Sequence, residues 1–322
     1  MSYSVSGIKT ESIQAVMNTL ARESHITRSE LASRCQLSLT TIGKIVNGLH
    51  EYGVLSITSP RTSEKGRSAS TVGFSDAATL AMFRIGADEM ILDLIDFRLR
   101  PLHRVLHRVT PDLDPWECMM VFLTECRRKL EQAHLQIRLC GIIAENKNID
   151  PSVAEQAISL QLGLTVTFRD SVSDAMARAA TEQGIADRGN CVALLTDSGD
   201  GIILYHGEIC KGALSPSPLT GHAHTNHVDR ITNTFLTLTA ILSPDVLLVC
   251  TEHSLRILRE RLEASLGAIT LPRPIAIEVR NIHDFVACGT GIAMRHAWLD
   301  EVMKDIYRLR PPSSDTHSLT PV

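Results

Sequence analysis

The sequence predicts an α+β protein in which a small N-terminal head is followed by two α/β lobes. Three observations support this fold class. Apolar residues recur at helical spacing over residues 10–54, a polar loop with strand-forming flanks comes next, and strand and helix patterns then alternate in two successive rounds. A chain of 322 residues has room for two or three domains. We expect boundaries at residues 1–75, 76–187 and 188–310, followed by a disordered tail at 311–322.

Residues 26–54 are typical of two short helices joined by a tight turn. Thr27 can cap the first helix with Glu30 as its reciprocal partner, in the T-x-x-E pattern of a capping box. Residues 36–37 make the turn, and Ser38 can cap the second helix. This layout is that of a helix-turn-helix, whose second helix enters the major groove of DNA.

The second helix has two distinct faces. Its buried stripe is formed by apolar residues at helical spacing: Ile42, Ile45 or Val46, and Leu49. Gly53 suits the left-handed position just after the helix ends. The opposite, polar side predicts contacts with the groove and with phosphates. These predicted contact residues are Ser38, Thr40, Thr41, Lys44 and Asn47.

The flanking segments complete a winged helix-turn-helix. An amphipathic helix over residues 10–22 precedes the pair. After the pair, Leu55 and Ile57 begin a strand, residues 61–68 form a polar loop, and residues 69–74 return as a second strand. We expect three basic side chains of this wing to reach phosphates or the minor groove: Arg61, Lys65 and Arg67. A small helical bundle without a role in DNA binding is the alternative interpretation.

The charge distribution favours DNA binding by the head. Residues 1–75 carry eight basic and five acidic side chains, a net charge of +3, whereas the whole chain carries −4. A basic head on an acidic body confines the electrostatic footprint to one domain. Because +3 is modest, we expect a homodimer or tetramer that places two heads on half-sites about 34–36 Å apart in a double-stranded operator.

Composition excludes several other classes. Hydrophobic residues make up 44% of the chain and charged residues 21%, which is ordinary for a globular protein. The sequence has no apolar run of about 18 residues and no apolar N-terminal core, so we expect neither a membrane span nor a signal peptide. The eight cysteines form no C-x-x-C pair, which indicates reduced thiols in a cytoplasmic protein and leaves one redox-sensing cysteine as an alternative.

The body repeats its order of elements. Strands are predicted at 80–87, 90–96, 102–109, 137–144 and 166–168, with helices at 116–134, 152–162 and 173–183. In the second round, strands are predicted at 191–196, 202–205, 208–210, 246–250 and 275–279, with helices at 229–241, 255–266 and 285–307. Two lobes with mixed sheets follow from this order, and the cleft between such lobes is a natural ligand site.

At this point the chain resembles a known family. The supporting segments are the helix-turn-helix, the wing motif Gly66-Arg67-Ser68-Ala69, the hairpin SGDGIILYHGEICKG at 198–212, residues 220–222, and ACGTGIAMRHAWL at 287–299. Over nearly all of residues 8–308 the sequence is similar to the ROK family (repressor, open reading frame, kinase). The resemblance implies a winged helix fused to a two-lobed actin/hexokinase-like (ribonuclease-H-like) domain, and a carbohydrate or sugar-phosphate effector.

Both phosphate-binding turns of the family's kinases are altered. Such turns hold phosphates through backbone N–H groups of glycine-rich segments. Residues 84–90 (RIGADEM) have one glycine and an acidic pair, and residues 197–201 (DSGDG) place two carboxylates where an anion would lie. Asp200 can equally be an ordinary turn residue. We therefore expect no ATP binding, no cofactor and no catalysis.

The family's base and sugar-binding motif are also changed. Asp170 stands at the position of the catalytic base, and it can act as a base or cap the helix over residues 171–183. The Glu-x-Gly-His motif that binds sugar reads Leu219-Thr220-Gly221-His222, so the histidine remains and the carboxylate is lost. The ligand-binding candidates are Asp170, His222 and His224.

A histidine cluster follows in the same loop. His222, His224 and His227 form H-x-H-x-x-H, and three imidazoles so close can bind a transition metal or sense protons. The spacing offers no fourth ligand, and no cysteine lies between Cys210 and Cys250 to rebuild the family's zinc site. We expect a polar loop and no metal.

These observations predict a sequence-specific DNA-binding transcriptional regulator, acting as a repressor, with a catalytically inactive body that dimerises and binds an effector. Two alternatives stay open. One is a ROK-type sugar kinase with an added DNA-binding head. The other is a regulator controlled by a protein partner instead of a small molecule.

Overall fold

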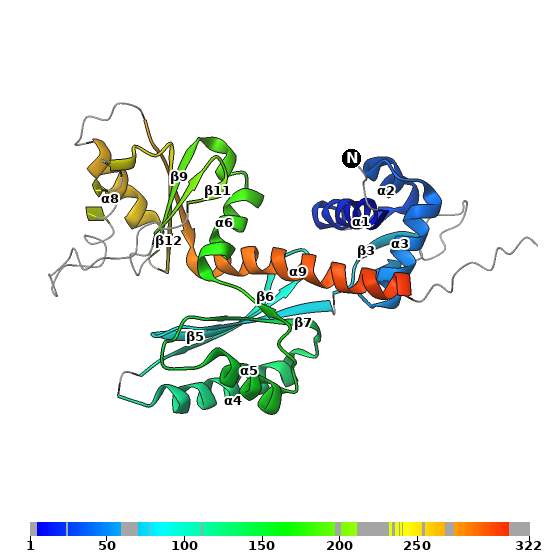
Figure 1. The fold of residues 1–322 in the computed structure, drawn as a ribbon, viewed down its shortest axis with the longest axis horizontal. Helices are drawn as coiled ribbons and strands as arrows, with labels where there is room; N and C mark the ends of the chain where they lie inside the picture. The colour runs from blue at the N-terminus through cyan, green and yellow to red at the C-terminus, as the bar shows by residue number, and fades with distance from the viewer. Residues whose placement is uncertain are drawn as a thin grey trace, which may run out of the picture.

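The computed structural model describes a head and two sheets that share one long C-terminal helix (Figure 1). It describes residues 5–23, 25–58, 70–76, 78–110, 112–196, 201–210, 232–233, 236–237, 239, 241–252, 255–267 and 274–308. The predicted tail at 311–322 and most of the helix predicted at 229–241 lie outside these residues.

The head consists of three helices and a small antiparallel sheet of order β1-β3-β2. Its elements are α1 (Val5–Arg22), β1 (Ile26–Thr27), α2 (Arg28–Cys35), α3 (Leu39–Glu51), β2 (Leu55–Thr58) and β3 (Thr71–Phe74). The helices are amphipathic, and their apolar stripes meet in a core that includes Leu20, Leu31 and Leu49. The predicted helix pair and strand pair are confirmed, and the first helix begins at Val5 instead of residue 10.

The first sheet of the body has the order β6-β5-β4-β7-β8. Its strands are β4 (Ala78–Ile85), β5 (Glu89–Asp96), β6 (Pro101–Arg108), β7 (Gln136–Ala144) and β8 (Phe168–Arg169). The first three pair antiparallel, and β7 and β8 are parallel additions. Two helices pack on one face, α4 (Pro115–Ala133) and α5 (Pro151–Leu162), where Phe83 and Phe122 meet edge to face.

The second sheet has the order β11-β10-β9-β12-β13. Its strands are β9 (Cys191–Thr196), β10 (Gly201–Tyr205), β11 (Glu208–Ile209), β12 (Val246–Thr251) and β13 (Ala276–Asn281). β9, β12 and β13 are parallel, and β10 and β11 extend the sheet as a hairpin. The helix α8 (Leu255–Gly267) packs against it, and α6 (Val172–Glu182) follows the first sheet in the chain. The mixed sheets predicted from the sequence are confirmed.

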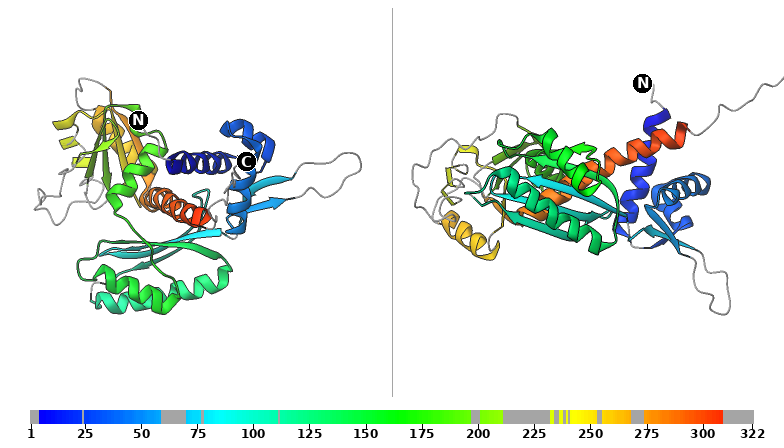
Figure 2. Two further views of the ribbon diagram at one scale, coloured as in Figure 1. Left: turned by 45° about the vertical axis from the view of Figure 1, so that its right-hand side comes forward. Right: turned by 90° about the horizontal axis from the view of Figure 1, so that it is seen from below.

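The long helix α9 (Ile282–Arg308) holds these parts together. It packs against α6, against strands of both sheets, and against α1 of the head (Figures 1 and 2). Trp298 of α9 is buried and meets the rings of Tyr52 and Phe97 edge to face. The apolar core therefore runs from the head into the body without a break.

Two general properties follow from the fold. All eight cysteines are free, and Cys140 lies in the core, where burial raises the pKa of its thiol to about 12. A thiol with so high a pKa stays protonated and unreactive near neutral pH. Among the helices that the structure describes, none combines the length and apolar character needed to cross a bilayer.

Candidate nucleic-acid interface and interlobe site

Local hydrogen bonds cap α2 and α3 on either side of the turn between them. The Glu30 backbone N–H donates to Thr27 Oγ1 at 3.3 Å, and the Thr27 N–H donates to Glu30 Oε2 at 3.0 Å, which confirms the predicted capping box. Gln36 adopts the left-handed conformation with φ 55°, and Ser38 Oγ then accepts from the Thr41 N–H at 3.1 Å. Gly53 lies just after the end of α3 and has the predicted left-handed conformation, with φ 69°.

The two faces of α3 are those that the spacing predicts. Ile42, Ile45, Val46 and Leu49 are buried, whereas Ser38, Thr40, Lys44 and Asn47 are exposed. Thr41 is half-buried, and its hydroxyl lies 2.9 Å from Ser38 Oγ, so it belongs to the cap as much as to the surface.

Two neighbours of this surface were not predicted from the sequence. Arg28 Nη2 donates to Asn47 Oδ1 at 2.8 Å, which brings a guanidinium from the start of α2 to the exposed side of α3. Leu39 is 61% exposed at the first position of α3. An apolar residue directly after a helix cap was the available signal for Leu39, and no local signal links Arg28 to Asn47.

Several predicted site residues lie outside the described residues. They are the wing residues Arg61, Lys65 and Arg67, the loop histidines His222, His224 and His227, and residues 197–200 of the second phosphate turn. The wing strands are described, and β2 pairs with β3 in antiparallel register up to Thr58 opposite Thr71.

Asp170 lies at the end of β8, and its side chain is only 4% exposed. One carboxylate oxygen accepts from the Ser171 N–H at 2.9 Å, and the other pairs with Arg178 of α6. The interpretation of Asp170 as the helix cap is wrong, because Ser171 Oγ accepts from the Asp174 N–H at 3.1 Å and is itself the cap. Asp170 instead pairs its buried carboxylate with Arg178, whose side chain is 32% exposed.

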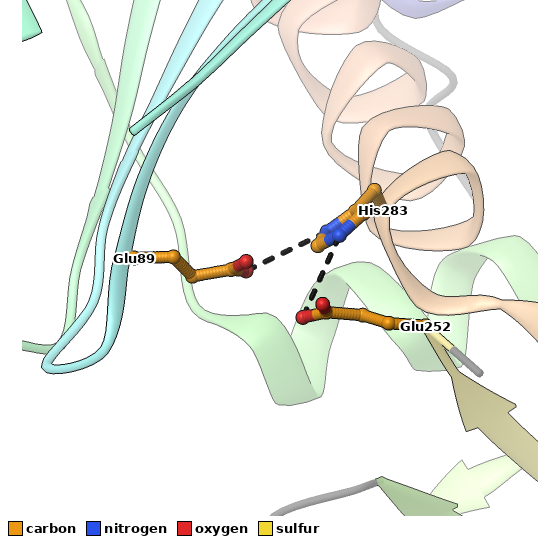
Figure 3. Close-up of side chains that lie close together, drawn as sticks. All are labelled: Glu89, Glu252 and His283. Carbon is orange, nitrogen blue, oxygen red and sulfur yellow. Dashed lines mark ion pairs between the residues drawn. The ribbon is translucent and has the colours of Figure 1, made fainter. Parts of the chain in front are cut away.

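A polar cluster joins elements from the two sheets and α9 (Figure 3). Glu89 begins β5, Glu252 follows β12, and His283 belongs to the first turn of α9. His283 Nδ1 lies 3.6 Å from Glu89 Oε1, and its Nε2 lies 3.5 Å from Glu252 Oε1. Arg84 Nη2 donates to Glu89 Oε1 at 2.6 Å and also contacts His283 Nδ1.

The neighbours of Glu89 shift the pKa of its carboxyl in opposite directions. Burial raises the pKa of the Glu89 carboxyl to about 7. The Arg84 guanidinium opposes that rise, and neighbouring Glu252 adds to it. Ligand atoms of Glu89, Glu252 and His283 lie within 4.8 Å of one another, a spacing that can hold a metal ion. Arg84 already supplies positive charge to Glu89 and donates to the imidazole, so the chemistry favours an interlobe polar contact.

The sequence pointed to only part of this cluster. Glu89 belongs to the acidic pair in the altered first phosphate turn. Its carboxylate lies near His283, whereas Asp88 is exposed. Glu252 and His283 carried no motif that could have singled them out.

The stability of a Glu89→Gln variant relative to the parent protein is expected to rise by about 2 kcal/mol as the pH increases from 4.5 to above 7. The folded-state pKa is raised from 4.5 to about 7, so stability from this carboxyl is complete below pH 4.5 and is lost as pH rises to about 7. The neutral amide removes that loss. Urea unfolding across this pH range measures the difference, with Glu260→Gln as an exposed control. A gap that stays constant with pH would contradict the assignment.

The comparisons with known proteins agree with this architecture. No protein-family model and no curated protein matches the sequence. A solved structure described as a ROK family transcriptional regulator, a homologue of the E. coli Mlc protein, is similar with a TM-score of 0.60 and 13% identity, over 93% of this chain and 98% of that one.

Two sugar kinases match about two thirds of the chain. A polyphosphate/ATP-glucomannokinase from Arthrobacter sp. strain KM has a TM-score of 0.48 and 15% identity, over 67% of this chain and 98% of its own. A ROK family glucokinase from Streptomyces griseus has a TM-score of 0.45 and 12% identity, over 66% of this chain and 98% of its own. The TM-score to the regulator is above 0.5, so this chain shares the fold of that ROK family protein.

Proposed function

We propose that the chain is a ROK family transcriptional regulator whose head is a winged helix-turn-helix that binds a specific DNA operator, acting as a repressor. The observation that carries this proposal is the capped α2–α3 pair, which presents the polar face of α3 to solvent. A match over 93% of the chain to a protein described as a transcriptional regulator supports it, because so long a match has to include most of the head.

The exposed face of α3 suits the major groove. Thr40, Lys44 and Asn47 offer hydrogen-bond donors and acceptors for base edges and phosphates. Arg28 adds a guanidinium beside Asn47, and exposed Leu39 suits contact with a thymine methyl group. The wing residues Arg61, Lys65 and Arg67 stay proposed contacts to phosphates or the minor groove.

Assembly follows from the small charge of the head. A net charge of +3 over residues 1–75 neutralises few phosphates, so we propose that a homodimer or tetramer binds two half-sites. The division into a head at 1–75 and lobes at 76–187 and 188–310 is part of the same proposal. Binding to DNA places such a regulator in the cytoplasm.

The body is proposed to transfer no phosphate. The carboxylate at the kinase base position, Asp170, is buried and paired with Arg178, and Glu89 turns a carboxylate toward the other sheet. A base held in an ion pair is poorly placed to take a proton from a sugar hydroxyl. We propose a carbohydrate or sugar phosphate as the ligand between the lobes. Such a ligand changes DNA binding only if it binds the DNA-competent and DNA-incompetent states of the protein with unequal affinity.

The test is operator binding by point variants. Lys44→Ala and Arg67→Ala are each expected to weaken binding to the DNA upstream of the protein's own gene and to reduce the salt slope by about 1. Lys147→Ala, an exposed change in the body, is the matched control and should leave both quantities unchanged. Gel shifts over a range of salt concentrations measure the affinities. A protein that ignores this DNA yet transfers phosphate from ATP to a hexose would overturn the proposal.

A further inference from the structure

A cavity lies where the head meets the body. The cavity is lined by described residues and has a volume of about 370 Å³. This volume falls within the range of about 300–1,000 Å³ that is typical of small-molecule sites. Its walls come from three places: Tyr52 after α3, Arg138 and its neighbours on β7, and Trp298 and Glu301 of α9. A molecule in this cavity would touch both the end of the proposed recognition helix and the body.

Arg138 is aimed at the head by a β-bulge. Thr79 pairs with Ile137 and Leu80 with Leu139, so Arg138 is the extra residue of β7. Bulges of this kind redirect a side chain out of the regular ladder. The guanidinium packs on Gly53 so closely that a Cβ at position 53 would overlap it.

The guanidinium of Arg138 is incompletely paired. Its Nη2 donates to Gln136 Oε1 at 2.5 Å, and its Nε is buried with no hydrogen-bond partner among the described residues. Arg138 also lines the cavity, so its guanidinium can meet an acceptor on a molecule bound there. A carboxylate is the acceptor that matches a guanidinium in shape and charge.

The rest of the lining is suited to a ring. Tyr52 and Trp298 meet edge to face with their ring centroids 6.3 Å apart, and apolar residues such as Leu164 and Val302 line the cavity beside them. Aromatic side chains favour edge-to-face and offset contacts with further rings. Glu301 is exposed on α9 and offers an acceptor for a hydroxyl group on the bound molecule.

We propose that this cavity is a regulatory site for a small aromatic carboxylate, which binds between Arg138 and the Tyr52–Trp298 pair and changes the affinity of the head for DNA. The regulatory part rests on the proposed function, and the binding part does not. The coupling is direct, because Tyr52 caps α3 and precedes Gly53, on which Arg138 packs. A ligand that draws Arg138 toward its carboxylate alters the contact that holds the end of α3.

Binding is tested without DNA by fluorescence. Trp116 and Trp298 are the two tryptophans of the chain, so Trp116→Phe leaves Trp298 as the reporter. Benzoate and 4-hydroxybenzoate should change its emission saturably, whereas benzamide, which lacks the charge, and acetate, which lacks the ring, should not. Arg138→Ala and Arg138→Lys should each weaken benzoate binding about tenfold or more, and Arg128→Ala on α4 should not. Absence of saturable binding by both aromatic acids, or equal binding by Arg138→Lys, would overturn the proposal.

Coupling is tested by repeating the operator titration with saturating benzoate. A change of severalfold in operator affinity, absent in Arg138→Lys, supports the regulatory role. Unchanged operator affinity with benzoate bound would refute regulation by this site. Failure of the ligand-free protein to bind the operator would count against the proposed function instead, since benzoate binding is measured independently.

Discussion

A Gly289→Ala variant is expected to lose about 3 kcal/mol of the free energy of unfolding, the upper part of the usual range for an overpacked core. Gly289 lies where α9 crosses α6, and a Cβ there would overlap the backbone carbonyl oxygen of Ala175. A backbone atom inside a helix cannot turn aside as a side chain can, so the two helices have to separate. The same segment accepts a hydrogen bond from Arg178 Nε to the Gly289 carbonyl at 3.1 Å, which separation would break.

The matched control is the same substitution at Gly43, inside α3. A Cβ at position 43 meets no atom within 4 Å, so alanine should stabilise the helix by up to about 1 kcal/mol. Urea unfolding followed by circular dichroism compares the two variants with the parent protein. Equal stability of Gly289→Ala and Gly43→Ala would show that α6 and α9 do not approach so closely.

An Arg178→Met variant is expected to lose about 3 kcal/mol of the free energy of unfolding. Its partner Asp170 is 4% exposed, so removal of the guanidinium leaves a buried carboxylate without its counter-ion. Desolvation of a single charge is far costlier than the loss of an exposed ion pair. The variant also loses the hydrogen bond from Arg178 to Gly289.

Two further variants separate these causes. Asp170→Asn combined with Arg178→Met removes both charges and should recover most of the loss. Arg169→Met breaks the ion pair with Glu155, in which the arginine is 60% exposed, and should cost much less than Arg178→Met. If Arg178→Met proves no more harmful than Arg169→Met, the buried ion pair contributes little to stability.

The two predictions meet at the α6–α9 crossing because this crossing joins the two sheets. α9 packs on α6 and on strands of both sheets, and its later turns contact α1 of the head. The same helix carries His283 of the interlobe cluster and Trp298, which contacts Tyr52 of the head. The Tyr52–Trp298 contact joins α9 to the end of the proposed recognition helix.

The sequence predicts the local structure of the head more fully than that of any other part of the protein. Thr27 with Glu30, Ser38 and Gly53 act on backbone groups only a few positions away, so their order along the chain is enough to predict the caps and the turn. The apolar spacing of α3 likewise predicts its buried side. Among the described residues, the strands and long helices of the body were also predictable from local patterns, with boundaries shifted by a few residues.

The interlobe cluster and the head–body cavity required the folded chain. Glu89, Glu252 and His283 are distant in sequence and meet because both sheets pack on α9, and Arg138 reaches Gly53 through a bulge that no local pattern marks. The tertiary structure was also needed to show that Asp170 pairs with Arg178 and does not cap the helix that follows it. Short-range hydrogen bonds and periodic burial depend on residues that are close in sequence, so the sequence alone predicts them. Contacts between distant side chains depend on how whole helices and strands pack, so they require the tertiary structure.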